Sequence, residues 1–135
     1  MDKKKEFYFP IKMNIKVTEQ DIDDIMVGAL EGGIVYWCCE AEVVEEKRCA
    51  DWGHEQIARG GALILHDNES DDKWELNLEN FLNGIRLWIE NGYAFECGAV
   101  ESTTSEYATI DCCQVDAIEA DRIVQYALFG EIVFG

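Results

Sequence analysis

The chain has 135 residues, of which 48% are hydrophobic, so its length and composition suit a globular protein and exclude a chain that is disordered by its charge. The first sixteen residues hold five of the eleven basic side chains, whereas residues 17–135 hold six basic side chains against 26 carboxylates. A body this acidic repels nucleic acid and anionic membranes, which excludes both as direct partners, and it attracts basic protein surfaces.

The N-terminal residues form a segment of their own. Residues 1–12 are predicted to be an extension or a short edge strand, and residues 13–135 to form a single α+β domain. Apolar side chains alternate in the extension at Phe7, Phe9 and Ile11. Its lysines precede aromatic and charged residues rather than an apolar signal core, and no apolar run approaches the ~20 residues that span a bilayer. We therefore expect a cytoplasmic protein that does not contact a membrane.

The first helix is predicted at 18–31. Thr18 is a suitable N-cap, Asp21 follows three residues later as a capping-box partner, and Gly32-Gly33 ends the helix. Apolar side chains recur at helical spacing and predict the buried face: Ile22, Ile25, Met26, Ala29 and Leu30. The acidic side chains of the first two turns therefore point away from the core.

A strand is predicted at 34–44, with one buried face and one solvent face. The residues on the face predicted to be buried are Val35, Trp37, Cys39, Ala41 and Val43. An irregular stretch follows at 45–60. Strands at 62–66 and 73–76 then flank an acidic loop, 67–72, and this pattern predicts a hairpin with an acidic tip.

The second half of the chain alternates between helices and strands. A helix is predicted from the N-cap Asn77 to Asn91-Gly92, and another from the N-cap Asp116 to Gly130, with Glu119 completing a capping box. Strands are predicted at 93–99, 107–110 and 132–134, with a loop at 101–106. The whole order predicts a mainly antiparallel sheet with about three helices packed on one face.

Six cysteines and two histidines raise the question of a metal site. Cys49 and His54 come nearest to a ligand pair, but the tight C-x2-4-C or H-x3-5-H pairs of structural zinc sites do not occur. The loop 67–72 lacks the glycine at the sixth position of a calcium loop. We predict no metal and no cofactor, and reduced cysteines that pack as small apolar side chains.

Catalytic motifs do not occur in the sequence either. No nucleophile elbow surrounds a cysteine, and a thiolate is disfavoured in so negative a protein, so we expect no enzymatic activity. Arg59-Gly60-Gly61 resembles an anion nest. This motif keeps a second hypothesis open, namely a sponge protein that sequesters a nucleotide immune signal through Arg59, Phe81 and Arg86.

Four stretches of the sequence are similar to those of a known protein family. They are DIDDIMVGALEGG at 21–33, EQIARGG at 55–61, FLNGI at 81–85 and IVQYALFG at 123–130. With them, the chain resembles a family of small phage and prophage proteins of Gram-positive bacteria. The resemblance implies an accessory protein of a mobile element, similar in character to anti-CRISPR and other counter-defence proteins, and it carries over no catalytic residue.

The leading hypothesis combines the resemblance to phage proteins with the excess of carboxylates. We predict an inhibitor in the host-cell cytoplasm that occupies the basic nucleic-acid groove of a host nuclease or CRISPR effector complex, as a DNA mimic. The carboxylates predicted to bind the partner are Asp67, Glu69, Asp71, Asp72 and Glu75 at the hairpin and Asp21, Asp23 and Asp24 on the first helix. A phage accessory protein without an inhibitory role is a third hypothesis.

Overall fold

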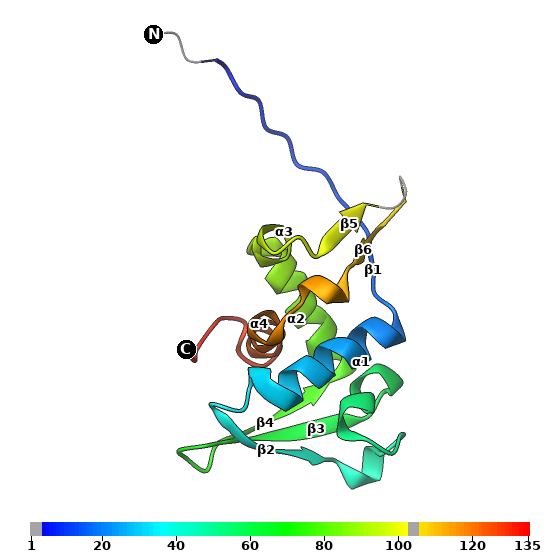
Figure 1. The fold of residues 1–135 in the computed structure, drawn as a ribbon, viewed down its shortest axis with the longest axis vertical. Coiled ribbons are helices and arrows are strands. Elements are labelled where there is room, and N and C mark those ends of the chain that lie inside the picture. Colours follow the sequence, from blue (N-terminus) through cyan, green and yellow to red (C-terminus); the bar gives the residue numbers. More distant parts are fainter. Residues whose placement is uncertain (1–3, 103–105) are drawn as a thin grey trace.

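The computed structural model describes residues 4–102 and 106–135 of the chain. These residues contain two three-stranded sheets and four α-helices, joined by loops and short helical turns (Figure 1). This arrangement confirms the predicted α+β class. The larger sheet is antiparallel, in the order β2-β3-β4, with β2 at Cys38–Val43, β3 at Ala62–Asp67 and β4 at Lys73–Asn77. The predicted hairpin is therefore the pair β3 and β4.

The smaller sheet has the order β1-β6-β5. Its strands are β1 at Ile15–Lys16, β6 at Ala108–Ile110 and β5 at Val100–Ser102. β1 runs parallel to β6, and β5 runs antiparallel to it. The predicted strand at 107–110 is confirmed as β6, whereas β5 occupies the start of the predicted loop, 101–106, whose middle residues, 103–105, lie outside the described parts.

Three of the helices begin where their caps predict. α1 spans Glu19–Gly28, α2 spans Leu78–Glu90 and α4 spans Ala117–Phe129. The Thr18 hydroxyl accepts a hydrogen bond from the Asp21 amide at 3.1 Å, and the Asp21 carboxylate accepts one from the Thr18 amide at 2.9 Å. A π-helical turn, Ala29–Gly33, prolongs α1 as far as the predicted glycine pair.

The core lies between the helices and one face of the larger sheet, as Figure 1 shows. Leu63, Leu65 and Leu76 point from the sheet into this core and have no exposed surface. α2 and α4 pack against each other at Gly84, where a Cβ atom would lie 2.6 Å from the carbonyl oxygen of Ile123. In the described parts of the chain, no α-helix covers the opposite face of the larger sheet, which carries polar side chains of its strands.

The first predicted strand was placed too early. Residues 34–37 form a turn, in which the amides of Trp37 and Cys38 both donate to the Ile34 carbonyl, and β2 begins only at Cys38. An irregular register between Cys38 and Glu40 then shifts the alternation of side chains. Cys39 and Val35, predicted to be buried, are therefore exposed.

Two further predicted strands are wrong. Within the predicted strand 93–99, residues Tyr93–Glu96 form the short helix α3, because Gly92 at φ 90° reverses the chain and its carbonyl accepts the Glu96 amide. The segment 132–134 makes no strand. The carboxamide of Gln125 binds it instead: the Gln125 Oε1 atom accepts hydrogen bonds from the amides of Val133 and Phe134, both at 2.8 Å.

Two side chains of the predicted helices also have other roles than expected. Glu119 does not complete a capping box: its carboxylate accepts hydrogen bonds from the Trp88 indole at 3.1 Å and from Arg122 at 2.6 Å. Leu82 belongs to the apolar pattern of α2, which leads one to expect it in the core, yet it is 42% exposed. Both differences arise because α2 packs on α4 through the face that contains Gly84, Ile85 and Trp88.

Candidate functional site

The tip of the β3–β4 hairpin is a fixed structure. The Asp67 amide donates to the Asp72 carbonyl at 2.9 Å and closes the loop. The Asp67 carboxylate accepts hydrogen bonds from the Ser70 hydroxyl at 2.7 Å and from the Glu69 amide at 3.3 Å. The Asn68 amide and carboxamide donate to the carbonyls of Trp37 and Tyr36, both at 2.9 Å. These contacts hold the acidic loop against the turn that precedes β2.

The carboxylates predicted at the hairpin tip differ in their exposure to solvent. The carboxylate of Asp67 accepts a hydrogen bond within the loop, and the residue is half-buried. Glu69, Asp71 and Asp72 are exposed. The outward carboxylates are thus displayed by a loop whose backbone is already ordered, which lowers the entropic cost of holding them against a partner.

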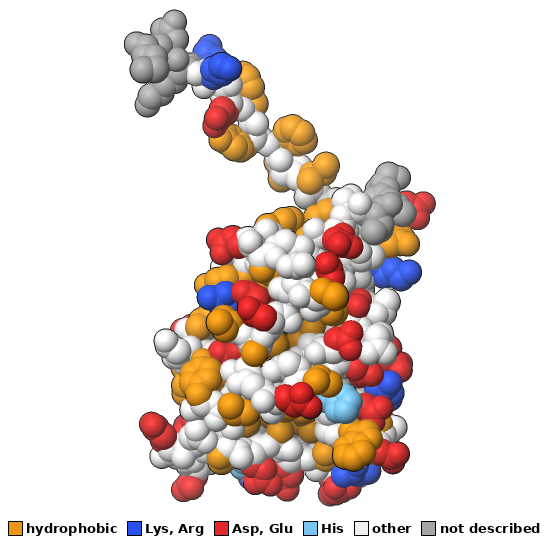
Figure 2. Space-filling model, viewed as in Figure 1, with side chains coloured by type: hydrophobic (Ala, Val, Ile, Leu, Met, Phe, Trp, Pro, Cys, Tyr) orange, Lys and Arg blue, Asp and Glu red, His pale blue; other side chains and the backbone are white. Residues whose placement is uncertain are grey.

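The solvent face of the larger sheet continues this acidic tip. Glu40 lies opposite His66, which lies opposite Lys73, and Glu42, Ile64 and Glu75 form the next row. We name the acidic sheet surface as the carboxylates of this face, of the hairpin tip and of the turn after β2: Glu40, Glu42, Glu45, Glu46, Glu69, Asp71, Asp72 and Glu75. Figure 2 shows acidic side chains along the lower edge of the molecule, where this sheet lies in Figure 1.

Few basic groups neutralise the acidic sheet surface. Lys47 pairs with Glu75 at 3.3 Å, and Arg48 pairs with Glu45 at 2.8 Å, while His66 lies 3.0 Å from Glu42. Within residues 4–102 and 106–135, five of its carboxylates form no ion pair: Glu40, Glu46, Glu69, Asp71 and Asp72. These five groups extend along the sheet from the hairpin tip to the turn after β2.

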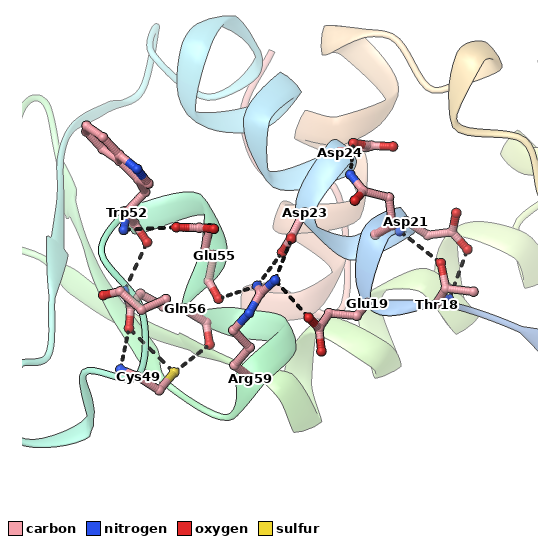
Figure 3. Close-up of polar contacts among 12 residues, drawn as sticks. Thr18, Glu19, Asp21, Asp23, Asp24, Cys49, Trp52, Glu55, Gln56 and Arg59 are labelled. Atoms are coloured by element: carbon pink, nitrogen blue, oxygen red, sulfur yellow. Dashed lines mark hydrogen bonds and ion pairs between the residues drawn. The ribbon is translucent and has the colours of Figure 1, made fainter.

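The predicted carboxylates of α1 have structural partners. Asp23 is 8% exposed and forms a two-pronged ion pair with Arg59, whose guanidinium nitrogens lie 2.9 and 3.0 Å from its oxygens (Figure 3). Arg59 also pairs with Glu19 at 2.8 Å. The Asp21 carboxylate caps α1, and Asp24 accepts a hydrogen bond from Gln20 at 2.8 Å. Of the three predicted carboxylates, only Asp24 is exposed and neither caps a helix nor forms a buried ion pair.

The two predicted acidic sets do not form one cluster. Arg59 lies three residues before the start of β3 and holds Asp23 at that end, whereas the hairpin tip follows Asp67 at the other end of the same strand. Six residues of strand separate these ends by about 17 Å at ~3.3 Å per residue. A partner that binds the tip therefore reaches α1 only if it covers the whole sheet.

The residues of the nucleotide hypothesis are not assembled into a pocket. Phe81 has no exposed surface and cannot contact a ligand. Arg86 pairs with Glu90 at 2.8 Å on α2, while Arg59 pairs with α1. The amides of Gly60 and Gly61 donate to the carbonyls of Ile57 and Gln56, so the predicted anion nest has no free amide at these two positions.

A buried polar network that the sequence pattern did not indicate fixes the C-terminal segment. The Asp121 carboxylate accepts hydrogen bonds from the Trp37 indole at 2.8 Å, from the Tyr36 hydroxyl at 2.6 Å and from Gln125 at 2.9 Å. Gln125, which has no exposed surface, then binds residues 133 and 134. Asp121 and Gln125 fall on one helix face at i, i+4 spacing, which is the only trace of this network in the sequence.

The cysteines are free thiols, but only Cys38 is buried outright. Cys39, Cys49 and Cys113 are exposed, so the expectation of buried thiols was wrong for them. Burial raises the pKa of Cys38 and Cys97. Burial, with the nearby Asp21 carboxylate, raises the pKa of Cys112 to about 12. These three thiols are therefore protonated near neutral pH and are poor nucleophiles.

These raised pKa values predict that alkali destabilises the fold. Cys112 has an ordinary pKa of 9.0, and burial raises the pKa to about 12; Tyr36 has an ordinary pKa of 10.0, and partial burial with the hydrogen bond to Asp121 raises the pKa to about 12. Above pH 9 the unfolded chain loses these protons first, so the free energy of unfolding falls as the pH rises toward 12. Urea denaturation at successive pH values measures this decline, and Cys112→Ser is expected to make it shallower. A free energy that stays constant over this range would contradict it.

No group of three or more potential metal ligands occurs within the described residues, and no helix there is long and apolar enough to cross a membrane. Comparisons of the chain with protein-family models, with curated proteins and with solved structures found no match.

Proposed function

We propose that the protein is a non-enzymatic inhibitor whose acidic sheet surface binds the basic nucleic-acid groove of another protein. The observation that carries this proposal is the ordered hairpin tip, which presents Glu69, Asp71 and Asp72 to solvent without an ion pair to any described residue. The partner class is a host nuclease or CRISPR effector complex, in line with the resemblance to phage proteins and the excess of carboxylates in the body.

The physical basis is competition for the same cationic side chains. A nucleic-acid groove gathers lysines and arginines that displace counterions from phosphates. Carboxylates on a fixed loop and sheet can occupy that groove at a small cost in ordering, because their backbone has already been fixed by folding. Two same-face side chains of one strand, such as Glu40 and Glu42, lie ~6.6 Å apart, so several cations can be engaged at once.

The acidic sheet surface supports this role better than α1 does. Binding a basic partner through Asp23 requires breaking its ion pair with Arg59, and losing one partner of a nearly buried pair is costly. Glu69, Asp71 and Asp72 require no such exchange. We therefore place the partner at the hairpin end of the sheet and assign Asp21 and Asp23 to the stability of α1.

A capture experiment with matched variants tests the proposal. Tagged wild-type protein, the triple variant Glu69→Gln/Asp71→Asn/Asp72→Asn, and a control with the same change of charge, Glu31→Gln/Glu101→Gln/Glu131→Gln, are each incubated with bacterial lysate at low and high salt. All six side chains are exposed, so we expect all three proteins to fold equally well.

We expect a nucleic-acid-binding protein that is captured by the wild type and the control, is lost with the hairpin variant, and is displaced by added DNA or RNA. High salt is expected to weaken the capture because exposed charges are screened. Equal capture by all three proteins would refute the assignment of the site. A partner that still binds when its groove is filled with polynucleotide would refute the mechanism.

A further inference from the structure

The N-terminal arm, residues 4–14, extends away from the body without regular structure (Figure 1). Its large apolar side chains have almost no contact with the rest of the chain: Phe7 is 83% exposed, Tyr8 86%, Phe9 79% and Ile11 83%. These are among the largest apolar groups a protein contains, and each aromatic one buries about 150 Å² or more when it packs. An exposed row of this kind is typical of a segment that packs on another molecule.

The charge of the arm is opposite to that of the body. Residues 4–16 carry four lysines and one carboxylate, whereas residues 17–135 carry 26 carboxylates and six basic groups. Figure 2 shows carboxylates on the end of the body from which the arm leaves. The exposed carboxylates of this end include Glu90, Glu96 and Glu101, which come from α2, α3 and β5. The basic arm is therefore complementary in charge to the acidic body of another copy of this protein.

A groove lies where the arm joins the body. Two adjoining hollows of about 420 Å³ and 520 Å³ share the base of the arm as one wall and α2 as the other. Apolar side chains of α2 and of the short helix α3 line the wall opposite the arm: Leu82, Ile85 and Ile89 from α2 and Phe95 from α3. Glu90 contributes a carboxylate, and both Leu82 and Phe95 are substantially exposed, at 42% and 56%. Arg86, which pairs with Glu90 at 2.8 Å, also lines the groove, so the groove mainly offers apolar surface on which the exposed apolar side chains of the arm can pack.

We propose that two copies of the chain exchange arms, so that the arm of each lies in the α2 groove of the other. Nine extended residues, 4–12, reach about 30 Å at ~3.3 Å each, which is enough to cross from one body to its neighbour. Three aromatic side chains bury roughly 450 Å² per arm, and two arms with the grooves that they cover bury roughly 1,800 Å², the size of a stable interface. The arm surface is separate from the acidic sheet surface, so this inference does not depend on the proposed inhibitory function.

Two other occupants fit the arm less well. Lysines beside aromatic side chains also suit an anionic membrane surface or a single-stranded nucleic acid. In either case, however, the 26 carboxylates of the body would be brought close to a polyanion and would oppose the contact. Two acidic bodies also repel each other, but the exchange offsets this repulsion by placing the lysines of two arms, rather than of one, against carboxylates of the opposite body.

Sedimentation equilibrium of the full chain over a range of concentrations tests the exchange. We expect the wild type to have twice the 15.4 kDa mass of one chain, under reducing conditions that keep its cysteines free. The variant Phe7→Ser/Phe9→Ser/Ile11→Ser is expected to weaken the dimer about 100-fold or more, because buried aromatic anchors dominate such interfaces. The control Val35→Ser/Ile118→Ser/Val133→Ser removes exposed apolar groups from the body and is expected to leave the dimer intact.

The position of the arm is read by crosslinking. A photoreactive amino acid at position 9, in a mixture of isotopically labelled and unlabelled chains, is expected to label residues 82–95 of the other chain. A wild type that is monomeric, or an arm variant that still dimerises, would overturn the proposal. So would crosslinks only within one chain, or a monomer that binds phosphatidylserine vesicles or single-stranded DNA through Phe7 and Phe9.

Discussion

Replacing Trp37 with alanine is expected to lower the free energy of unfolding by about 4–5 kcal/mol, the upper part of the range for a buried aromatic side chain. The indole is 2% exposed and stacks on Phe134 with ring centroids 4.9 Å apart, and it also contacts Trp74 and Phe129. Alanine leaves a cavity in this aromatic cluster and removes one donor from the buried Asp121 carboxylate. Urea denaturation followed by circular dichroism measures the change.

Two matched variants separate the causes of this loss. Trp37→Phe keeps most of the ring but removes the hydrogen bond to Asp121, and we expect it to cost about 1–3 kcal/mol. Trp52→Ala changes a tryptophan that is 66% exposed, and we expect it to alter stability by less than about 0.5 kcal/mol. If Trp52→Ala destabilised the protein as much as Trp37→Ala, the aromatic cluster around Trp37 would not be the centre of this part of the core.

Replacing Gly84 with alanine is expected to destabilise the protein by about 1–3 kcal/mol, although alanine is the better helix former. A Cβ atom at this position would lie 2.6 Å from the Ile123 carbonyl oxygen and 2.8 Å from both the Ala127 amide nitrogen and its Cβ atom. Two of these three contacts are backbone atoms of α4, so the clash is relieved only if α2 and α4 move apart. Thermal unfolding measures the loss.

Gly28→Ala is the control for this prediction. It places the same methyl group in a helix, at the end of α1, where the nearest atom is the Ala120 Cβ atom at an ordinary 3.6 Å. We expect Gly28→Ala to be neutral or to stabilise the protein by up to about 1 kcal/mol. The account of the α2–α4 contact is wrong if Gly84→Ala also stabilises the protein.

The helices and the hairpin could be predicted because their signals are local. Thr18, Asn77 and Asp116 each accept the hydrogen bond of an N-cap, and the spacing of apolar residues identified the faces that pack. The hairpin followed from two apolar runs around a polar loop, and its pairing from Ala62 to His66 agrees with that pattern.

The errors arose where tertiary contacts decide the local structure. The run Tyr93-Ala94-Phe95 is as consistent with a strand as with a short helix, and the reversal at Gly92 selects the helix. The segment 132–134 has the composition of a strand but is bound by Gln125 instead of by a neighbouring strand. Contacts between side chains far apart in the sequence leave little local trace in a single sequence.

The candidate site could be predicted in outline only. The sequence placed Glu69, Asp71 and Asp72 at an exposed hairpin tip, and the structure has them there. It did not reveal that Asp67 closes the loop and that Asp23 is held by Arg59, because both roles depend on partners brought close by folding. The charge of a residue is read from the sequence, but its freedom to bind a partner is not.

A competition titration tests the central claim most directly. The partner captured by the protein is bound to a labelled nucleic acid, and increasing amounts of the protein are added. We predict that the nucleic acid is released in full, that its apparent dissociation constant rises in proportion to the free protein, and that the Glu69→Gln/Asp71→Asn/Asp72→Asn variant releases far less. A stable complex of partner, nucleic acid and protein together would contradict the claim that the acidic sheet surface and the nucleic acid occupy the same groove.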